Sequence, residues 1–206
     1  MARQIDYYFS AASPWAYIGH ALFESLARTH GCTVGYKPVF LGELFAETGG
    51  LPLAKRHPAR QRYRMMELQR WREKRGLNFH LKPQNWPFDP KLADGVVIAA
   101  IETGQNPEPF MRSMFQSIWE DQLNLGDAAT VTDVANKAGL PADKLVARAS
   151  SAEVAARYEQ NRQDAIAAGV FGSPGYVLDG EVFWGQDRLE LLGDALKSGR
   201  KPYLAA

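Results

Sequence analysis

A serine stands where the first helix of the chain is predicted to begin. Ser13-Pro14 follows an apolar, strand-like stretch at residues 5–9 and precedes Ile18, Leu22 and Leu26, whose spacing of four predicts the buried stripe of a helix. The opening of a helix presents unpaired backbone N–H groups and about half a unit of positive charge, which suits an anion. Ser13 can therefore be a plain N-cap or a hydroxyl beside a bound anion, and its position alone leaves both roles open.

Two later segments carry polar side chains at predicted turns. Gly172-Ser173-Pro174-Gly175 predicts a sharp turn, in which an isolated Ser-Pro bond is ordinarily trans. Asp187 lies where the last helix is predicted to open, so it suits an N-cap or a first-turn carboxylate.

Basic residues gather between residues 55 and 75, where nine arginines and lysines stand against two glutamates. Such a run ordinarily forms the solvated face of a helix. Arg56, Arg60 and Arg64 nevertheless share one face at a spacing of four, and a guanidinium can bind a carboxylate through two hydrogen bonds.

Composition and cysteine usage exclude several classes of protein. A formal net charge of +1 gives no general attraction to nucleic acid or to a membrane, and no apolar run approaches the roughly 18 residues of a membrane span. Cys32 is the only cysteine, so an internal disulfide is excluded. The four histidines lack metal-ligand spacing, and no phosphate loop or dinucleotide fingerprint is present. Because a strand pattern begins within a few residues of the start, we expect no signal peptide and a cytoplasmic location.

The order of predicted elements gives the fold class. A strand at 5–9, a helix ending at Gly31 and a strand at 33–40 form a βαβ unit. Helical periodicity then dominates, over 58–75, 91–103, 110–119, 131–138, 142–149 and 151–168, with start signals at Thr130 and Pro141. The segment 110–119 has a wide apolar face, made by Phe110, Met111, Met114, Phe115, Ile118 and Trp119. Strands at 176–178 and 181–184, joined at Asp179-Gly180, and a helix at 187–197 close the chain. This order predicts an α/β, thioredoxin-like domain (1–41 and 169–206) split by an all-helical insertion (42–168).

Several motifs resemble those of 2-hydroxychromene-2-carboxylate isomerases and, similarly, of kappa-class glutathione transferases. The matching stretches are FSAASPWAY at 9–17, Tyr63 followed by LQRW at 68–71, GVFGSP at 169–174 and FWGQDRL at 183–189. Both families have the DsbA-like thioredoxin fold. The resemblance implies that the chain binds glutathione as a cofactor, acts on a small aromatic substrate and forms a homodimer.

The resemblance also implies a role for Ser13. In disulfide oxidoreductases of this fold the helix begins with Cys-x-x-Cys, whereas Ser13-Pro14-Trp15-Ala16 has no sulfur at either end. Thiol–disulfide exchange by this site is therefore excluded. If glutathione brings its own sulfur, Ser13 is expected to donate a hydrogen bond to the thiolate and to stabilise it.

Further site residues follow from the same resemblance. It implies a cis bond at Pro174, with the backbone of Ser173 paired to the cysteinyl main chain of glutathione. Gln186 and Asp187 are expected to hold the γ-glutamyl end, with Asp187 facing its ammonium.

Two substrate contacts are expected in the helical part. Arg60, three residues before Tyr63, stands where related sequences carry a lysine near a carboxylate of glutathione or substrate. Asn85-Trp86 lies in a proline-rich loop that could cover an aromatic substrate, although simple packing accounts for Trp86 equally well.

The resemblance therefore predicts an enzyme, a glutathione-dependent isomerase that interconverts 2-hydroxychromene-2-carboxylate, or a related aromatic, and trans-o-hydroxybenzylidenepyruvate. Two alternatives remain: a kappa-like transferase that conjugates glutathione to an electrophile, and a non-catalytic module that binds glutathione or a peptide.

Overall fold

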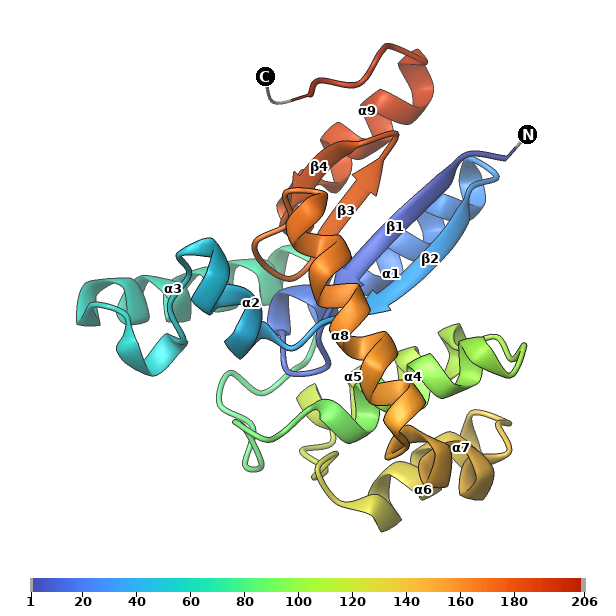
Figure 1. The fold of residues 1–206 in the computed structure, drawn as a ribbon. Helices are drawn as coiled ribbons and strands as arrows, with labels where there is room; N and C mark the ends of the chain where they lie inside the picture. Colours follow the sequence, from blue (N-terminus) through green and yellow to red (C-terminus); the bar gives the residue numbers. More distant parts are fainter. Residues whose placement is uncertain (1, 205–206) are drawn as a thin grey trace.

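A four-stranded mixed sheet lies at the centre of the computed structural model, which describes residues 2–204 (Figure 1). The strands lie in the order β2-β1-β3-β4. β1 (Gln4–Phe9) pairs in parallel with β2 (Thr33–Pro38) and antiparallel with β3 (Gly175–Leu178), which pairs antiparallel with β4 (Glu181–Trp184). The predicted βαβ unit and closing hairpin are thus confirmed.

The first helix, α1 (Pro14–Thr29), begins as predicted. Ser13 is its N-cap, since the Ser13 hydroxyl accepts a hydrogen bond from the backbone N–H of Ala16 at 3.3 Å. The predicted buried stripe is wrong at Leu22, which is 36% exposed. The face turned to the sheet runs instead through Phe23, whose ring lies 4.7 Å from those of Tyr7 and Tyr176.

The segment between β2 and β3 is helical, as predicted, with differences at its ends. A helix at α2 (Leu41–Thr48) was not predicted, and α6 begins after Asp127, whose carboxylate caps it, rather than at Thr130. The other elements of the segment are a 3₁₀ turn (Leu53–Lys55), α3 (Pro58–Lys74), α4 (Lys91–Glu102), α5 (Glu108–Trp119), α6 (Ala128–Lys137), α7 (Ala142–Ala149) and α8 (Ala152–Ala167). Figure 1 shows α8 crossing one face of the sheet, with α1 on the other.

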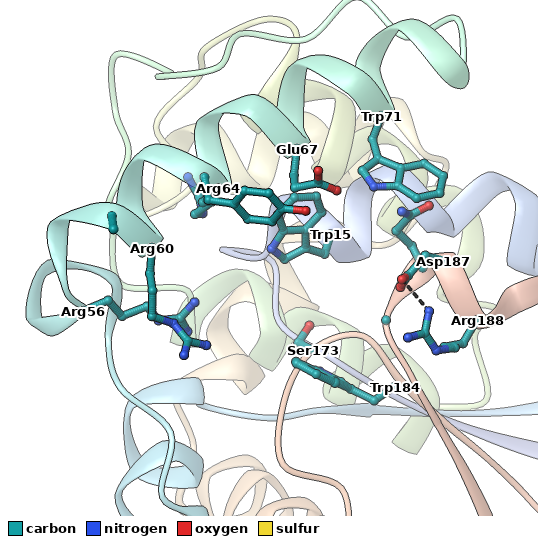
Figure 2. Close-up of a pocket in the computed structure, with 14 residues that line it drawn as sticks. Trp15, Arg56, Arg60, Arg64, Glu67, Trp71, Ser173, Trp184, Asp187 and Arg188 are labelled. Atoms are coloured by element: carbon teal, nitrogen blue, oxygen red, sulfur yellow. Dashed lines mark hydrogen bonds and ion pairs between the residues drawn. The ribbon is translucent and has the colours of Figure 1, made fainter.

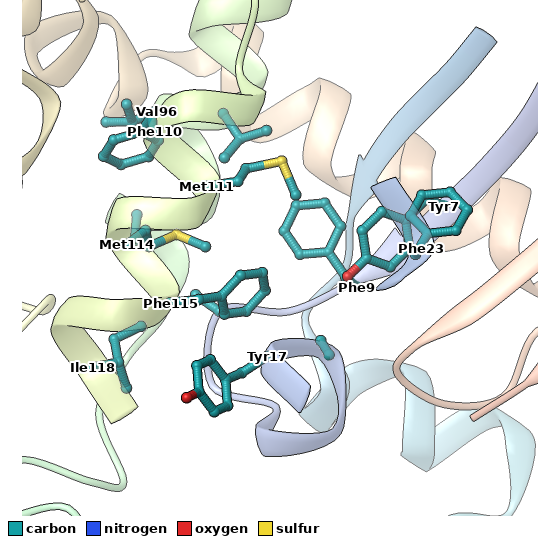
Figure 3. Close-up of a cluster of buried hydrophobic side chains, with 14 of the residues drawn as sticks. Tyr7, Phe9, Tyr17, Phe23, Val96, Phe110, Met111, Met114, Phe115 and Ile118 are labelled. Carbon is teal, nitrogen blue, oxygen red and sulfur yellow. The ribbon is translucent and has the colours of Figure 1, made fainter. Parts of the chain in front are cut away.

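The apolar face of α5 is the centre of the core. Its predicted residues are all buried. Figure 3 shows Phe110 beside Val96 of α4, and Phe115 toward β1 and α1. Phe115 is 6.2 Å from Phe9 and 5.2 Å from His20, measured between ring centroids. One buried cluster therefore joins the sheet to the helical segment. The domain boundaries proposed from the sequence stay a prediction. Their outer ends, residues 1 and 206, lie outside the described residues.

The chain ends in a hairpin and a helix. Asp179 and Gly180 both have positive φ (52° and 87°), as a two-residue hairpin turn requires. The last helix, α9 (Leu189–Ser198), begins later than predicted, because a 3₁₀ turn (Gln186–Arg188) precedes it and Asp187 does not cap it. No helix of the described residues is long and apolar enough to cross a membrane.

A buried carboxyl group in α4 fixes the loop between β1 and α1. Asp94 accepts hydrogen bonds from the backbone N–H of Ala11 (2.9 Å) and the hydroxyl of Tyr158 in α8 (2.7 Å), and Ser10 Oγ lies 3.4 Å away. Burial raises the pKa of Asp94 to about 7. The loop that leads into Ser13 is therefore held by the helical segment.

We expect the contribution of Asp94 to stability to fall as pH rises from about 4 to 7. In this range the native Asp94 keeps a proton that the unfolded chain, with an aspartate pKa of about 3.9, has lost. Asp94→Asn should make the unfolding free energy less dependent on pH, by up to about 1.4 kcal/mol for each pH unit. Urea unfolding at several pH values measures the slope; equal slopes for the two proteins would contradict the assignment.

Candidate functional site

A cavity of about 520 Å³ opens between α3 and the turns that flank β3 and β4 (Figure 2). Its lining combines flat aromatic rings with charged side chains. The lining residues are Trp15, Arg56, Ala59, Arg60, Tyr63, Arg64, Glu67, Trp71, Ser173, Trp184, Gly185, Gln186, Asp187 and Arg188. Four of the residues predicted for the site are among them: Arg60, Ser173, Gln186 and Asp187.

Ser13 lies directly behind Ser173 at one side of the cavity. Its hydroxyl donates a hydrogen bond to the carbonyl oxygen of Ser173 at 3.2 Å, and Ser13 is only 4% exposed. The Ser173-Pro174 bond is cis, as the resemblance implied and against the ordinary preference of such a bond. Ser173 Oγ in turn accepts from the backbone N–H of Ser10 at 3.2 Å. The opening of α1 and the turn before β3 are thus joined at this point.

Gln186 and Asp187 stand at another side of the cavity, each already paired. Gln186 is 2% exposed, and its side-chain carbonyl accepts from Arg75 at 3.1 Å. The carboxylate of Asp187 pairs with Arg188 at 2.5 Å, where the resemblance implied a ligand ammonium. The role of Arg75 as the partner of Gln186 was not predicted, because the sequence places Arg75 within a basic run that is expected to be solvated.

A glycine in α1 sets the position of Gln186. A Cβ at Gly19 would lie 2.6 Å from the Cβ of Gln186 and 3.1 Å from the hydroxyl of Tyr176. Only glycine allows so close an approach of α1 to the turn that carries Gln186. This contact could not be predicted from the sequence, because Gly19 lies inside a regular helical pattern.

Three guanidinium groups occupy the wall formed by α3 and the turn before it. Within the described residues, Arg56, Arg60 and Arg64 form no ion pair with a carboxylate. Burial, and secondarily the charge of Arg56, lowers the pKa of Arg64 to about 10. The pKa of Arg56 is also lowered, first by burial and second by the charge of Arg60.

The structure does not bring Asn85 and Trp86 into the cavity lining. The amide of Asn85 donates to the carbonyl of Gln122 at 2.7 Å. The indole N–H of Trp86 donates to the carbonyl of Ala12 at 3.0 Å, and the guanidinium carbon of Arg64 lies 5.3 Å from the centre of its ring. Trp86 thus braces the loop before Ser13 and supports Arg64.

The chemistry of this arrangement is that of an anion-binding cavity with aromatic walls. Four arginines line it against the carboxylates of Glu67 and Asp187, which already pair with Arg70 and Arg188. No group of three potential metal ligands occurs among the described residues. A ligand with carboxylates and an aromatic body fits this set of side chains.

Comparisons with known proteins agree with this fold. The model of the DSBA-like thioredoxin domain matches residues 4–197. A Sphingobium xenophagum protein named 2-hydroxychromene-2-carboxylate isomerase is 29% identical over 194 residues, covering 93% of this chain and 97% of the relative. Glutathione S-transferase kappa 1 of Caenorhabditis elegans is 24% identical over 206 residues, covering 94% and 91%.

A solved structure of 2-hydroxychromene-2-carboxylate isomerase shares the fold with a TM-score of 0.81, at 24% identity and covering 95% of both chains. The predicted resemblance and fold class are therefore confirmed, and relatives named as isomerases support an enzyme. With the domain model matching nearly its whole length, the chain belongs to the DSBA-like thioredoxin family.

Proposed function

We propose that the protein is a glutathione-dependent isomerase that interconverts 2-hydroxychromene-2-carboxylate, or a related aromatic acid, and trans-o-hydroxybenzylidenepyruvate. One observation carries the proposal: the Ser13 hydroxyl caps α1 and faces the carbonyl of Ser173 beside a cis-proline. The fold's redox cysteine is thereby replaced by a hydrogen-bond donor. The names of the relatives support the choice of substrate.

The residues present fit glutathione as the cofactor. Ser173 lines the cavity, and its backbone could pair with the cysteinyl main chain of the tripeptide. Asp187 can exchange Arg188 for the γ-glutamyl ammonium, and exposed Arg60 can bind a carboxylate. Bound glutathione would supply a thiolate that adds to the conjugated double bond, permits rotation about the resulting single bond and then leaves.

Ser13 would stabilise the thiolate by exchanging one hydrogen bond for another. Its hydroxyl now donates to the carbonyl of Ser173. Once a ligand N–H takes that carbonyl, the hydroxyl is free to turn toward the sulfur. A charge-assisted hydrogen bond of about 1.5–3 kcal/mol lowers a thiol pKa by one to two units, at about 1.4 kcal/mol each. The N–H groups at the start of α1 act in the same direction.

We expect the purified protein to interconvert the two isomers only when glutathione is present, and to leave the glutathione concentration unchanged. Ultraviolet spectroscopy follows the isomers, and a thiol assay follows glutathione. Equal rates without the tripeptide would refute the mechanism. Stoichiometric loss of glutathione would instead assign the kappa-like transferase activity, which the Caenorhabditis elegans relative's name favours.

Ser13→Ala should lower kcat/KM by about 10- to 100-fold, because a charge-assisted hydrogen bond to the thiolate is lost. It should also raise the apparent pKa of bound glutathione, followed by thiolate absorbance against pH. Ser117→Ala, which changes a buried serine in α5, is the control and should alter neither quantity. A Ser13→Ala protein with an unchanged thiol pKa would show that Ser13 is an N-cap only.

Gly19→Ala should weaken glutathione binding by about tenfold, because the added methyl group displaces Gln186 and its neighbour Asp187. Calorimetric titration measures the dissociation constant. Gly193→Ala in α9 is the matched control, since its Cβ would meet only the end of the Leu26 side chain, at 3.2 Å. Equal glutathione affinities in the two variants would show that Gln186 and Asp187 do not bind glutathione.

A further inference from the structure

We propose that Arg64, supported by Arg56, binds the carboxylate of the acceptor substrate, so that the cavity selects aromatic acids over neutral electrophiles. The inference deepens the proposed function, because it places an acceptor in the cavity that glutathione is proposed to share. Sequence reasoning favoured Arg60 for a carboxylate, and the structure separates the three arginines by their surroundings.

Arg64 differs from Arg60 in its burial. Arg60 is exposed, whereas Arg64 is half-buried, and loss of solvent is the first cause of its lowered pKa. The charge of Arg56 is the second cause, so the two guanidinium groups act on each other. A partly desolvated cation without a counter-ion is costly, and a ligand carboxylate would offset that cost.

The position of Arg64 relative to Ser13 also favours it. Its guanidinium lies over the ring of Trp86, and the indole N–H of Trp86 is bonded to the carbonyl of Ala12. Two contacts therefore connect Arg64 to the residue immediately before Ser13. In benzylidenepyruvate the carboxylate is three bonds from the carbon that the sulfur attacks, so a carboxylate-binding group must lie close to the sulfur site. Arg60 lies about one turn nearer the start of α3, and within the described residues no comparable contact joins it to the loop before Ser13.

The rest of the lining supports an aromatic, anionic acceptor. Trp15 and Trp184 provide flat apolar surface in the same cavity (Figure 2), and Tyr63 also lines it. The carboxylates of Glu67 and Asp187 are neutralised by Arg70 and Arg188. A neutral acceptor would occupy the aromatic surface but leave Arg64 without a counter-ion.

Calorimetric titration with trans-cinnamate and its neutral isostere trans-cinnamamide tests the inference without requiring turnover. We expect wild type to bind the acid at least about tenfold more tightly than the amide. Arg64→Gln should abolish this preference, and Arg64→Lys should keep part of it because the charge remains. Arg62→Gln, on an exposed position of the same helix, is the matched control and should behave as wild type.

Three results would overturn the inference. Wild type could bind acid and amide equally; Arg60→Gln could abolish the preference while Arg64→Gln keeps it; or Arg64→Gln could weaken glutathione and not cinnamate, which would assign Arg64 to the tripeptide. Glutathione titrations of the same proteins separate this inference from the proposed function. A preference for cinnamate that depends on Arg64, in a protein that does not bind glutathione, would support the acid site and reject the glutathione mechanism.

Discussion

The hydrogen bond between the hydroxyl of Ser13 and the carbonyl of Ser173 joins two parts of the chain that are 160 residues apart. One partner opens the first helix, and the other stands at a cis-proline before the third strand. Ser13 follows β1 and Ser173 precedes β3. Because these two strands are paired in the sheet, the fold itself brings the two residues together. The cavity is built around this junction, with Ser173 in its lining and Ser13 behind it.

The loop that carries Ser13 is held from several directions at once. Asp94 accepts from the N–H of Ala11, Ser173 accepts from the N–H of Ser10, and Trp86 donates to the carbonyl of Ala12. Each anchor comes from a different element: α4, the turn before β3, and the loop before α4. Together these three hydrogen bonds fix the start of α1 before any ligand binds. Less conformational entropy of the loop is therefore lost on binding.

Local signals account for what the sequence predicted. Ser13-Pro14, the apolar face of α5 and Asp179-Gly180 depend on neighbours along the chain, so these features could be recognised from the sequence alone. Asp94 and Gly19 could not, because their roles arise from contacts with segments far away in sequence. For the arginines, the spacing indicates a shared helix face, but only the packed structure shows that Arg60 is exposed while Arg64 is half-buried and lies over the ring of Trp86.

Helix α3 forms one wall of the cavity yet contributes little to the core, since Leu68 is its only buried residue among the described ones. Figure 1 shows it extending away from the sheet. Substitutions on its exposed positions therefore cost little folding stability, while those that face the cavity change what the wall recognises. Substitutions in this one helix can therefore change which acceptor substrate is recognised during evolution, while the contact between Ser13 and Ser173 is kept.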